Sequence, residues 1–383
     1  MTQGKHVQKD SRGDMVSVLM FGLTPVMGGV ETFIYNVVAH SDLDRIHFEF
    51  LVAGDKKPVY ADELEALCGT GCIHHVPEIR SSGLEGYREV SRFFRENGER
   101  FDWMHLNICT AAKVLYCYPF SKRCGFKVLT HSHTSSAFGT LFHRLGRPLL
   151  RNVSDCRLAC SEPAAEWMFG GDYVRDTRII NNGIDVDRFR FSESERERIR
   201  TMYGIPQDAF VIGHVGRFSK VKNHTYLLRV FAELAQYDAQ AYLLLIGAGE
   251  LEGEIRSCCR NYEISERVIF PGLQEDTSPY YSAMDAFVMP SLYEGLPVVG
   301  VEAAASGLGC YFSGGVSRQA AILEKTRFLS IDENPSAWVD ALLHDRDVLC
   351  DYAGRLFAGD TVKDAGYDIC YVAKTIDDIY LEE

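Results

Sequence analysis

Short apolar runs alternate with segments of helical periodicity along the chain, and this alternation restricts the possible fold more than any other feature. We expect a buried strand at each of these runs: Val16–Leu23, Phe48–Val52, Val128–Thr130, Arg157–Cys160, Val211–Val215, Tyr242–Ile246, Val268–Phe270, Ala286–Met289 and Cys310–Phe312. Between them, apolar residues recur at helical spacing, as in Val30, Phe33, Ile34, Val37 and Val38. Alternating strands and helices favour parallel sheets with helices on both faces, so the predicted fold class is α/β.

The length of 383 residues exceeds what one hydrophobic core usually serves, so we expect two domains with a cleft between them. The border falls near Asn181–Asp185, because a highly charged stretch follows it and a fresh strand begins at Val211. We therefore predict a flexible tail over 1–14, a Rossmann-like domain over 15–185, a second one over 186–365 and a terminal segment over 366–383. Apolar residues at helical spacing predict that this segment is a helix, which could pack back on the first domain.

The composition limits which binding partners and which cellular compartment we expect for the protein. The net charge of −13 opposes sequence-independent binding to nucleic acid. No apolar run approaches the roughly 20 residues that cross a bilayer, and the polar start lacks a signal-peptide core, so we expect a cytoplasmic protein. The 12 cysteines are scattered like thiols of a reducing compartment, and the pairs Cys68/Cys72 and Cys156/Cys160 lack the further ligands of a zinc site. We predict no metal.

The first predicted strand leads into a glycine pair, Gly28–Gly29, and a helical pattern starts directly after it. Two glycines let a ligand approach the backbone closely, and the unpaired N–H groups of a helix N-terminus attract an anion. The alternative is a tight connection between strand and helix that binds nothing.

A basic loop follows the predicted strand Val211–Val215 and contains Arg217, Lys220 and Lys222. Open α/β sheets bind ligands at the carboxyl ends of their strands. Arginine and lysine side chains there can neutralise a diphosphate leaving group without a metal ion. An exposed basic loop without a ligand is the alternative.

Two acidic residues, Glu294 and Glu302, follow the predicted strand Ala286–Met289, and Pro297 prevents one helix from containing both. Glu294 then belongs to a loop, where it can hold sugar hydroxyls, and Glu302 to the following helix, where it can accept the hydroxyls of a ribose. A glycoside hydrolase would need two acids facing across the scissile bond, which this spacing gives no reason to expect. The glycine-rich run 247–253 imitates a dinucleotide fingerprint, but it follows the second strand of its domain instead of the first.

These segments together resemble the retaining glycosyltransferases of the GT-B fold, especially the family 4 (group 1) enzymes of bacterial capsular and exopolysaccharide biosynthesis. The resemblance runs from about Val16 to about Leu343, and its motifs are Gly28–Thr32, Asn182–Asp185, Gly216–Arg217 with Lys222, and Glu294 with Glu302. It implies two Rossmann-like domains that face a central cleft, with a nucleotide-sugar donor held mainly by the second domain.

The resemblance also implies a role for each motif. Arg217 and Lys222 would bind the diphosphate, Glu294 with the adjoining Gly295 and Leu296 would bind the sugar, Glu302 would bind the ribose, and the Gly28–Gly29 turn would close on the phosphates. The family also places a histidine of the first domain beside the sugar. His133 is the first candidate because a small polar residue follows it, and His131 is the rival. A satisfied surface histidine without such a role is the alternative.

Retention of the anomeric configuration in such enzymes is ascribed to attack by the acceptor from the same face of the sugar from which the leaving group departs. The phosphate itself takes the acceptor's proton. Catalysis is then positioning and charge stabilisation, so the resemblance implies neither a cofactor nor a metal. The chain departs from many members at Gly314–Gln319, where they carry an acidic residue, so a donor contact there could differ. The DxD look-alikes Asp185–Asp187 and Asp345–Asp347 lie away from any phosphate loop and do not indicate a metal site.

The stretch from Trp103 to Ser154 contains no acidic residue, although the whole chain is acidic. Its cations include Lys113 and Lys127, and those that we assign to an acceptor or membrane side are Lys122, Arg123, Arg144, Arg147 and Arg151. Apolar residues alternate with the last three, as on a surface that meets anionic lipid headgroups or a lipid-diphosphate acceptor. A solvated basic face is the alternative, and Gly146 and Pro148 argue against a continuous amphipathic helix.

The sequence thus predicts an enzyme that moves a hexose-type sugar, with retention, from a UDP-linked donor to a glycan or lipid-linked acceptor in polysaccharide biosynthesis. We expect it in the cytoplasm, at the inner face of the membrane. A dinucleotide-dependent Rossmann enzyme is one alternative. A non-catalytic protein that binds sugar nucleotides is the other, and it would bind nucleotide without forming product.

Overall fold

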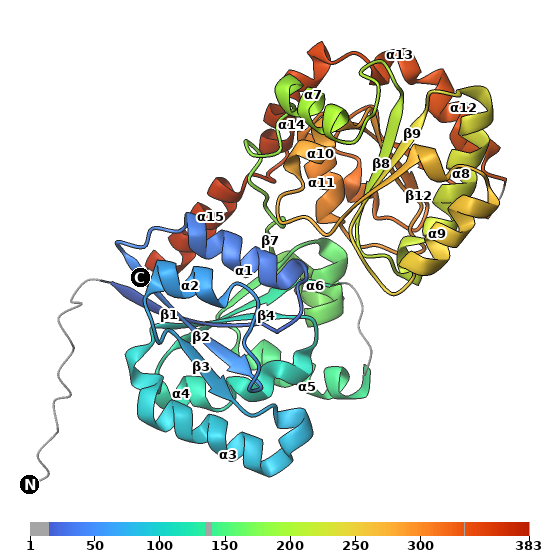
Figure 1. Cartoon of the computed structure of the whole chain (residues 1–383). Helices are drawn as coiled ribbons and strands as arrows, with labels where there is room; N and C mark the ends of the chain where they lie inside the picture. Colours follow the sequence, from blue (N-terminus) through green and yellow to red (C-terminus); the bar gives the residue numbers. More distant parts are fainter. Residues whose placement is uncertain (1–14, 135–139, 333, 383) are drawn as a thin grey trace, which may run out of the picture. The chain divides into compact units, whose positions relative to one another are not determined.

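The computed structural model describes residues 15–134, 140–332 and 334–382, and the chain divides into two compact units (Figure 1). The first unit comprises the chain up to Gly183 together with the segment from Ile369 to the end, and the second comprises Ile184–Asp368. These borders lie a few residues from the predicted 185/186 and 365/366. The tail predicted over 1–14 lies outside the described residues.

The described part of the first unit contains a parallel sheet of seven strands in the order β3-β2-β1-β4-β5-β6-β7. The strands are β1 (Val16–Phe21), β2 (Ile46–Ala53), β3 (Ile73–Val76), β4 (Trp103–Ile108), β5 (Lys127–Ser132), β6 (Cys156–Ala159) and β7 (Arg178–Ile179). The strand order reverses between β1 and β4, and such a reversal leaves a crevice at the carboxyl ends of the strands.

Helices cover both faces of this sheet. They are α1 (Gly29–His40), α2 (Ala61–Cys68), α3 (Ile79–Asn97), α4 (Phe120–Cys124), α5 (Thr140–Val153) and α6 (Glu162–Phe169), with short 3-10 turns η1 (Gly98–Arg100), η2 (Ala111–Tyr116) and η3 (Gly171–Asp176).

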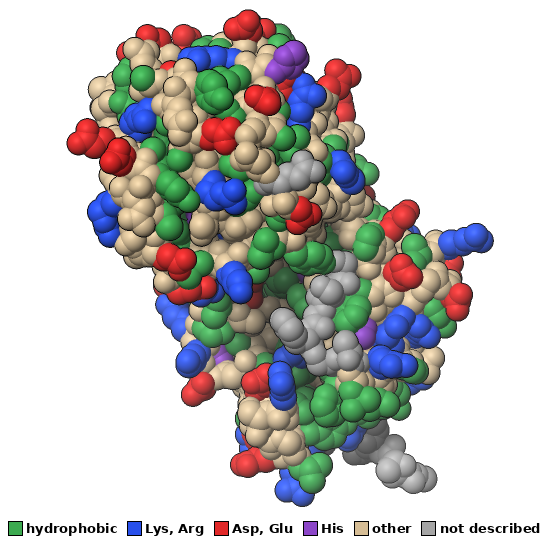
Figure 2. All heavy atoms as spheres, turned by 90° about the vertical axis from the view of Figure 1, so that its right-hand side faces the viewer, with side chains coloured by type: hydrophobic (Ala, Val, Ile, Leu, Met, Phe, Trp, Pro, Cys, Tyr) green, Lys and Arg blue, Asp and Glu red, His purple; other side chains and the backbone are tan. Residues whose placement is uncertain are grey.

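The expectation that Gly146 and Pro148 would interrupt α5 is wrong. The helix continues through Pro148, whose side chain is exposed. The opposite face of the helix packs on the first unit and holds it in place. On that face the ring of buried His143 stacks on Trp167, with 4.1 Å between the ring centroids. Hydrophobic side chains gather at the bottom of Figure 2, and α5 contributes exposed leucine and phenylalanine side chains to the surface of this unit.

The last helix of the chain, α15 (Ile369–Leu381), belongs to the first unit and packs beside α1. Its apolar stripe shares a hydrophobic core with the buried face of α1. Trp103 Nε1 donates a hydrogen bond to the carbonyl of Tyr380 at 3.1 Å, and Asp42 N donates one to Asp377 Oδ2 at 2.9 Å. The chain therefore returns to the first unit after it has completed the second.

The second unit contains, in its described residues, a parallel sheet of six strands in the order β10-β9-β8-β11-β12-β13. The strands are β8 (Val211–Val215), β9 (Tyr242–Ile246), β10 (Val268–Gly272), β11 (Ala286–Met289), β12 (Gly309–Ser313) and β13 (Arg327–Leu329). The helices are α7 (Glu193–Met202), α8 (His224–Tyr237), α9 (Glu252–Asn261), α10 (Ser278–Ala283), α11 (Val298–Ala305), α12 (Ser336–His344), α13 (Arg346–Leu349) and α14 (Ala358–Asp364). Short 3-10 turns lie at η4 (Lys220–Lys222), η5 (Ser265–Arg267), η6 (Arg318–Ala320) and η7 (Ala353–Phe357).

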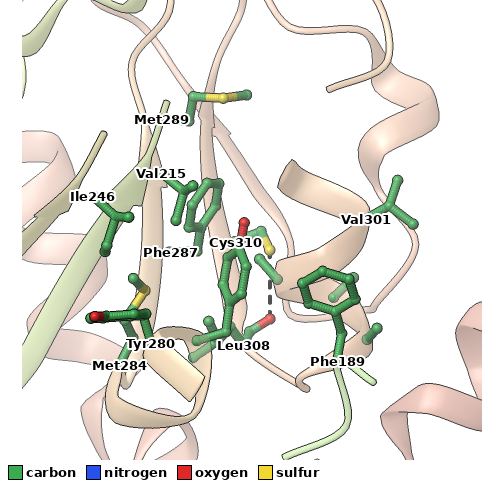
Figure 3. Packing of buried hydrophobic residues seen from close by; sticks show 14 of the residues in the cluster. Phe189, Val215, Ile246, Tyr280, Met284, Phe287, Met289, Val301, Leu308 and Cys310 are labelled. Carbon is green, nitrogen blue, oxygen red and sulfur yellow. Dashed lines mark hydrogen bonds between the residues drawn. The ribbon is translucent and has the colours of Figure 1, made fainter. Parts of the chain in front are cut away.

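Two hydrophobic cores lie on opposite faces of this second sheet, because successive side chains of a strand point to opposite sides. Val211 and Val215 of β8 belong to one core and Ile212 to the other. Figure 3 shows Val215, Phe287 and Met289 of neighbouring strands packed in the first of these cores. Here too the strand order reverses, between β8 and β11, so the carboxyl ends of these strands are a second candidate position for a ligand. No described helix is long and apolar enough to span a bilayer.

We predict that Ile376→Ala lowers the free energy of unfolding by about 2–5 kcal/mol, since Ile376 of α15 is fully buried and truncation leaves a cavity in the core of the first unit. Tyr371→Ala on the same helix is the control: its side chain is exposed, so the expected change stays within about 0.5 kcal/mol. Urea denaturation followed by circular dichroism measures both. Equal effects of the two substitutions would contradict the packing described for α15.

Candidate active site

The basic loop of the second unit starts where β8 ends and leads through η4 into α8. Asn223, between η4 and α8, has a left-handed backbone with φ of 54°, which turns the chain sharply after Lys222. The aliphatic part of Lys222 passes close to the backbone of Gly216, since a Cβ at Gly216 would lie 3.3 Å from Lys222 Cε. The lysine side chain is therefore held against the carboxyl end of β8.

Lys222 and Glu294 form an ion pair at this edge, with 2.7 Å between Nζ and Oε1. Their side chains are only 17% and 20% exposed. Glu294 follows β11, the strand next to β8, so parallel strands bring both residues to the same edge. The sequence predicts both residues at a ligand site, and the structure brings them into direct contact.

The loop that carries Glu294 is fixed by the segment after β12. Glu294 N donates to the carbonyl of Gly315 at 3.0 Å, and Ser317 N donates to the carbonyl of Glu294 at 3.1 Å. Gly315 permits this close approach, because a Cβ there would lie 2.2 Å from the carbonyl oxygen of Leu292. The segment in which the chain departs from many family members thus holds the Glu294 loop in place. Gly295 is exposed beside it, and Leu296 packs on the core of the unit.

Arg217 lies on the surface of the same edge and pairs with Glu250, with 3.1 Å between Nη2 and Oε2. Both side chains are exposed, and an exposed ion pair contributes about 0–1 kcal/mol. Its guanidinium can therefore turn from Glu250 to an anionic ligand at little cost.

The glycine-rich run after β9 has a structural explanation. Gly247 has φ of +136°, and a Cβ there would lie 2.1 Å from the carbonyl oxygen of Gly216. This glycine lets the loop after β9 pack on the loop that carries Arg217. Close packing of two loops accounts for the motif without a dinucleotide.

Glu302 lies in α11, whose N-cap is Pro297, so the proline separates it from the Glu294 loop as the sequence predicts. Its Oε2 accepts a hydrogen bond from the Tyr281 hydroxyl at 2.7 Å. Burial raises the pKa of Glu302 to about 7, although the hydrogen bond from Tyr281 acts in the opposite direction. Near neutral pH this carboxyl is therefore present in both protonation states.

In the first unit, His105 of β4, His131 of β5 and His133, which directly follows β5, form a column of rings. Ring centroids lie 5.7 Å apart for His105 and His131 and 4.2 Å apart for His131 and His133. Burial lowers the pKa of His133 to about 4 and those of the other two further below their usual range. His133 is partly exposed, whereas His131 is fully buried. His133 is therefore the more accessible of the two candidates.

Asn107, at the end of β4, contacts His133, with 2.9 Å between Oδ1 and the ring Nε2. Because an amide oxygen can only accept, Nε2 carries the hydrogen. The sequence interpretation missed Asn107. The segment Trp103–Ile108 is not among the apolar runs predicted as strands, because His105 and Asn107 interrupt it.

A pocket of about 470 Å³ opens at the carboxyl ends of β1, β2 and β4, where the order of the first sheet reverses. Its polar lining includes Glu31 of α1, Asn107 and Lys113 of η2. Glu31 is buried and accepts a hydrogen bond from Thr24 Oγ1 at 2.7 Å. Lys113 Nζ lies 3.8 Å from Glu78 Oε1, and burial lowers the pKa of Lys113. The predicted Gly28–Gly29 turn starts α1 next to this pocket, with Gly28 as the N-cap.

Within the described ranges, no group of three or more His, Cys, Asp or Glu side chains is arranged to hold a metal ion.

Comparison with known proteins identifies the family. Residues 195–344 match the model of the family "Glycosyl transferases group 1", and residues 27–188 match that of "Glycosyltransferase Family 4". A Bacillus subtilis (strain 168) protein named as a glycosyltransferase, EpsF, is 33% identical over 356 residues, which cover 89% of this chain and 90% of that protein. The chain belongs to the group 1 glycosyltransferases.

Two further proteins illustrate the range of this glycosyltransferase's relatives. An Escherichia coli UDP-Gal:alpha-D-GlcNAc-diphosphoundecaprenol alpha-1,3-galactosyltransferase is 31% identical over 145 residues, or 35% of this chain and 36% of that protein. The crystal structure of Anabaena HepE in complex with UDP and glucose superposes with a TM-score of 0.75 at 17% identity, and the match covers 95% of this chain and 99% of that one. The GT-B fold class, with two Rossmann-like α/β units, is thereby confirmed.

We predict that Glu302→Gln changes how the stability of this glycosyltransferase depends on pH. The folded wild type retains a proton on Glu302 between the ordinary pKa of 4.5 and about 7, where the unfolded chain has lost it. Its stability contribution is therefore complete below pH 4.5 and is lost as the pH rises through 7. Glutamine still accepts the Tyr281 hydrogen bond but does not titrate, so the variant is the more stable form at pH 8.

Denaturation midpoints measured from pH 5 to pH 8 test this expectation. The difference between Glu302→Gln and wild type should grow with pH over this range. Parallel pH profiles of the two proteins would show that Glu302 titrates normally in the folded state.

Proposed function

We propose that this glycosyltransferase moves a hexose-type sugar from a UDP-linked donor to a growing glycan or a lipid-linked acceptor in capsular or exopolysaccharide biosynthesis, with retention and without a metal ion. The Lys222–Glu294 ion pair at the edge of the second sheet is the observation that carries the proposal. It combines a cation suited to a diphosphate with a carboxylate suited to sugar hydroxyls within 2.7 Å.

The donor requires a different contact for each of its parts. Lys222 and Arg217 neutralise the diphosphate, Glu294 accepts hydrogen bonds from the sugar with Gly295 and Leu296 beside it, and Glu302 accepts those of the ribose. The paired state of Lys222 and Glu294 supports this assignment, because each charge compensates the other until the donor replaces both partners. The complex of HepE with UDP and glucose supports UDP as the nucleotide.

Retention follows from the order in which bonds change. The bond between the anomeric carbon and the phosphate oxygen breaks first, and its electron pair leaves with UDP. The acceptor oxygen then attacks from the face that UDP departs, and a phosphate oxygen takes the acceptor's proton. The protein supplies positioning and positive charge, which stabilise the leaving diphosphate. We assign His133 to the sugar and the Gly28–Gly29 turn to the phosphates, both from the first unit.

The acceptor is assigned to the pocket of the first unit. Glu31 and Asn107 offer hydrogen-bonding groups for sugar hydroxyls, and Lys113 offers a cation for a diphosphate. The Escherichia coli relative is named for transfer to a diphosphoundecaprenol-linked sugar, which supports a lipid-linked acceptor. The protein then works in the cytoplasm at the inner face of the membrane.

Substitution of Lys222 tests the assignment of the diphosphate. We expect Lys222→Ala to lower kcat/KM for sugar transfer by about 10²–10³-fold, the usual loss when one group that stabilises developing charge is removed. Lys220→Ala is the matched control: this lysine lies two positions earlier, is exposed, and should leave transfer unchanged. Release of UDP in a coupled assay measures both. Equal losses in the two variants would show that only the net charge of the loop matters.

Glu294→Gln separates binding of the nucleotide from transfer of the sugar. The substitution removes the ionic partner of Lys222, so UDP, which has no sugar, should bind severalfold more tightly. Transfer should fall, because a neutral amide binds sugar hydroxyls more weakly than a carboxylate does. Calorimetry with UDP and the transfer assay give the two readouts, and Glu252→Gln, which breaks only the exposed pair with Arg256, is the control. Tight UDP binding by the wild type without any product would favour a non-catalytic binding protein.

A further inference from the structure

A buried tyrosine of the second unit carries a hydroxyl that the donor contacts assigned above do not use. Tyr281 lies in α10, and its side chain is fully buried. Its ring packs on two phenylalanines, with centroids 5.8 Å from Phe189 and 6.0 Å from Phe287, both of which Figure 3 labels. A phenylalanine could make the same ring contacts, and burial of a hydroxyl costs free energy unless it is hydrogen-bonded. Packing alone therefore does not explain the hydroxyl.

The Tyr281 hydroxyl contacts two acceptors of α11. Its oxygen lies 2.7 Å from Glu302 Oε2 and 3.3 Å from the carbonyl oxygen of Val299, in the first turn of the helix. The shorter distance is the usual one for a hydrogen bond between two oxygens. Tyr281 thus links the carboxyl group of Glu302 to the start of the helix that carries it, which restricts the rotation of that carboxyl group.

This hydrogen bond makes the two carboxyl oxygens of Glu302 different. Oε2 accepts from Tyr281, whereas the described residues provide no hydrogen bond to Oε1. Glu302 is also partly exposed, although Tyr281 is not. Oε1 is therefore the oxygen that remains for a ligand.

Two charged side chains face Glu302 from other elements of the second unit. Arg188, in the segment that leads into α7, lowers the pKa of Glu302, and Asp276, between β10 and α10, raises it. The two form an ion pair with 3.0 Å between Arg188 Nη2 and Asp276 Oδ1, so their charges oppose each other. Burial is the largest influence and raises the pKa of Glu302 to about 7, against the hydrogen bond from Tyr281.

Tyr281 also determines where a proton on Glu302 resides. Burial raises the pKa of Tyr281 well above its usual range, so its hydroxyl stays a donor at every pH near neutrality. Since Oε2 accepts from this hydroxyl, a proton that Glu302 binds lies on Oε1. A proton and a ligand hydroxyl then compete for the same oxygen.

We propose that Tyr281 is a positioning residue of the donor site, which holds Oε2 of Glu302 and so presents an ionised Oε1 to the ribose hydroxyls. The inference deepens the proposed function, on which it rests, because Glu302 is assigned to the ribose there. Binding of the ribose strengthens as the pH rises through about 7, where Glu302 loses its proton. The Tyr281 hydroxyl keeps this transition from moving to higher pH, because it stabilises the ionised form.

The test compares UDP with 2′-deoxy-UDP, which lacks one ribose hydroxyl, by calorimetry on the full chain from pH 5 to pH 9. Both nucleotides carry the same diphosphate, so its titration and its contacts cancel in the ratio of their Kd values. We expect wild type to prefer UDP about tenfold at pH 9, the effect of one hydrogen bond to a charged group, and to lose most of this preference at pH 5. In Glu302→Gln the ratio should not vary with pH.

Tyr281→Phe keeps the ring and removes the hydroxyl. The midpoint of the UDP preference should move upward by about one pH unit, because the ionised carboxyl loses its donor. At pH 7 the preference should fall about threefold, while the Kd of 2′-deoxy-UDP changes less than about twofold. Tyr280→Phe is the matched control in the same helix: its hydroxyl lies 3.4 Å from that of Tyr203 instead of contacting Glu302, so its ratio should equal that of wild type. Thermal melting shows whether each variant is folded.

The inference alone is overturned if wild type prefers UDP but Tyr281→Phe changes neither the size nor the pH midpoint of this preference, or if both tyrosine variants reduce it equally. Should Tyr281→Phe not fold, a wild-type preference that is constant from pH 5 to pH 9 would still overturn it. Two further results would contradict the proposed function and the inference with it. No binding of either nucleotide to wild type would contradict the donor site, and equal binding of both at every pH would contradict the assignment of Glu302 to the ribose.

Discussion

The ion pair of Lys222 with Glu294 is the interaction on which the organisation of the second unit's site depends. Both side chains are only partly exposed, and each charge compensates the other. Their meeting requires three loops, those after β8, β11 and β12, to pack closely at one edge of the sheet. Gly315 permits one of these approaches, and Gly247 brings a fourth loop, after β9, onto the first. The glycines are thus as necessary to the site as the charged residues, although none of them needs to touch a ligand.

The sequence predicted much of this arrangement because burial of parallel strands leaves a direct signature. Each of the nine apolar runs contains or overlaps a strand, and Pro297 separates Glu294 from Glu302 as expected. Four strands were not predicted: β3 and β4, whose apolar character is interrupted by histidines and an asparagine, and the short strands β7 and β13, which have only two and three residues. In β4 these polar residues are buried and have specific partners: His105 Nδ1 lies 2.5 Å from the Tyr380 hydroxyl, and Asn107 contacts His133. A rule that equates buried strands with apolar runs fails where a strand supplies functional or paired polar groups.

Tertiary contacts determine what the sequence pattern could not. Local propensity disfavours a helix through Gly146 and Pro148, but the glycine is what allows α5 to pack against Ala111. The same holds for the hydrogen bonds of Arg147 and Arg151, whose acceptors are backbone carbonyls of α6 and carry no sequence signal. Positive charge in a stretch of sequence shows where cations are plentiful. It does not show which of them are already engaged by the protein itself.

The proposed chemistry makes different electrostatic demands on the two units. A departing diphosphate needs cations, and the second unit offers Lys222 and Arg217 at the reversal point of its sheet. The hydroxyls of a sugar need hydrogen-bonding groups, and the corresponding point of the first unit offers Glu31 and Asn107 beside a single cation, Lys113. His133 follows the same logic. Burial in a column of three rings lowers its pKa to about 4, so at neutral pH it is an uncharged donor through Nε2. An uncharged ring also avoids repulsion with its neighbours His105 and His131 in the column.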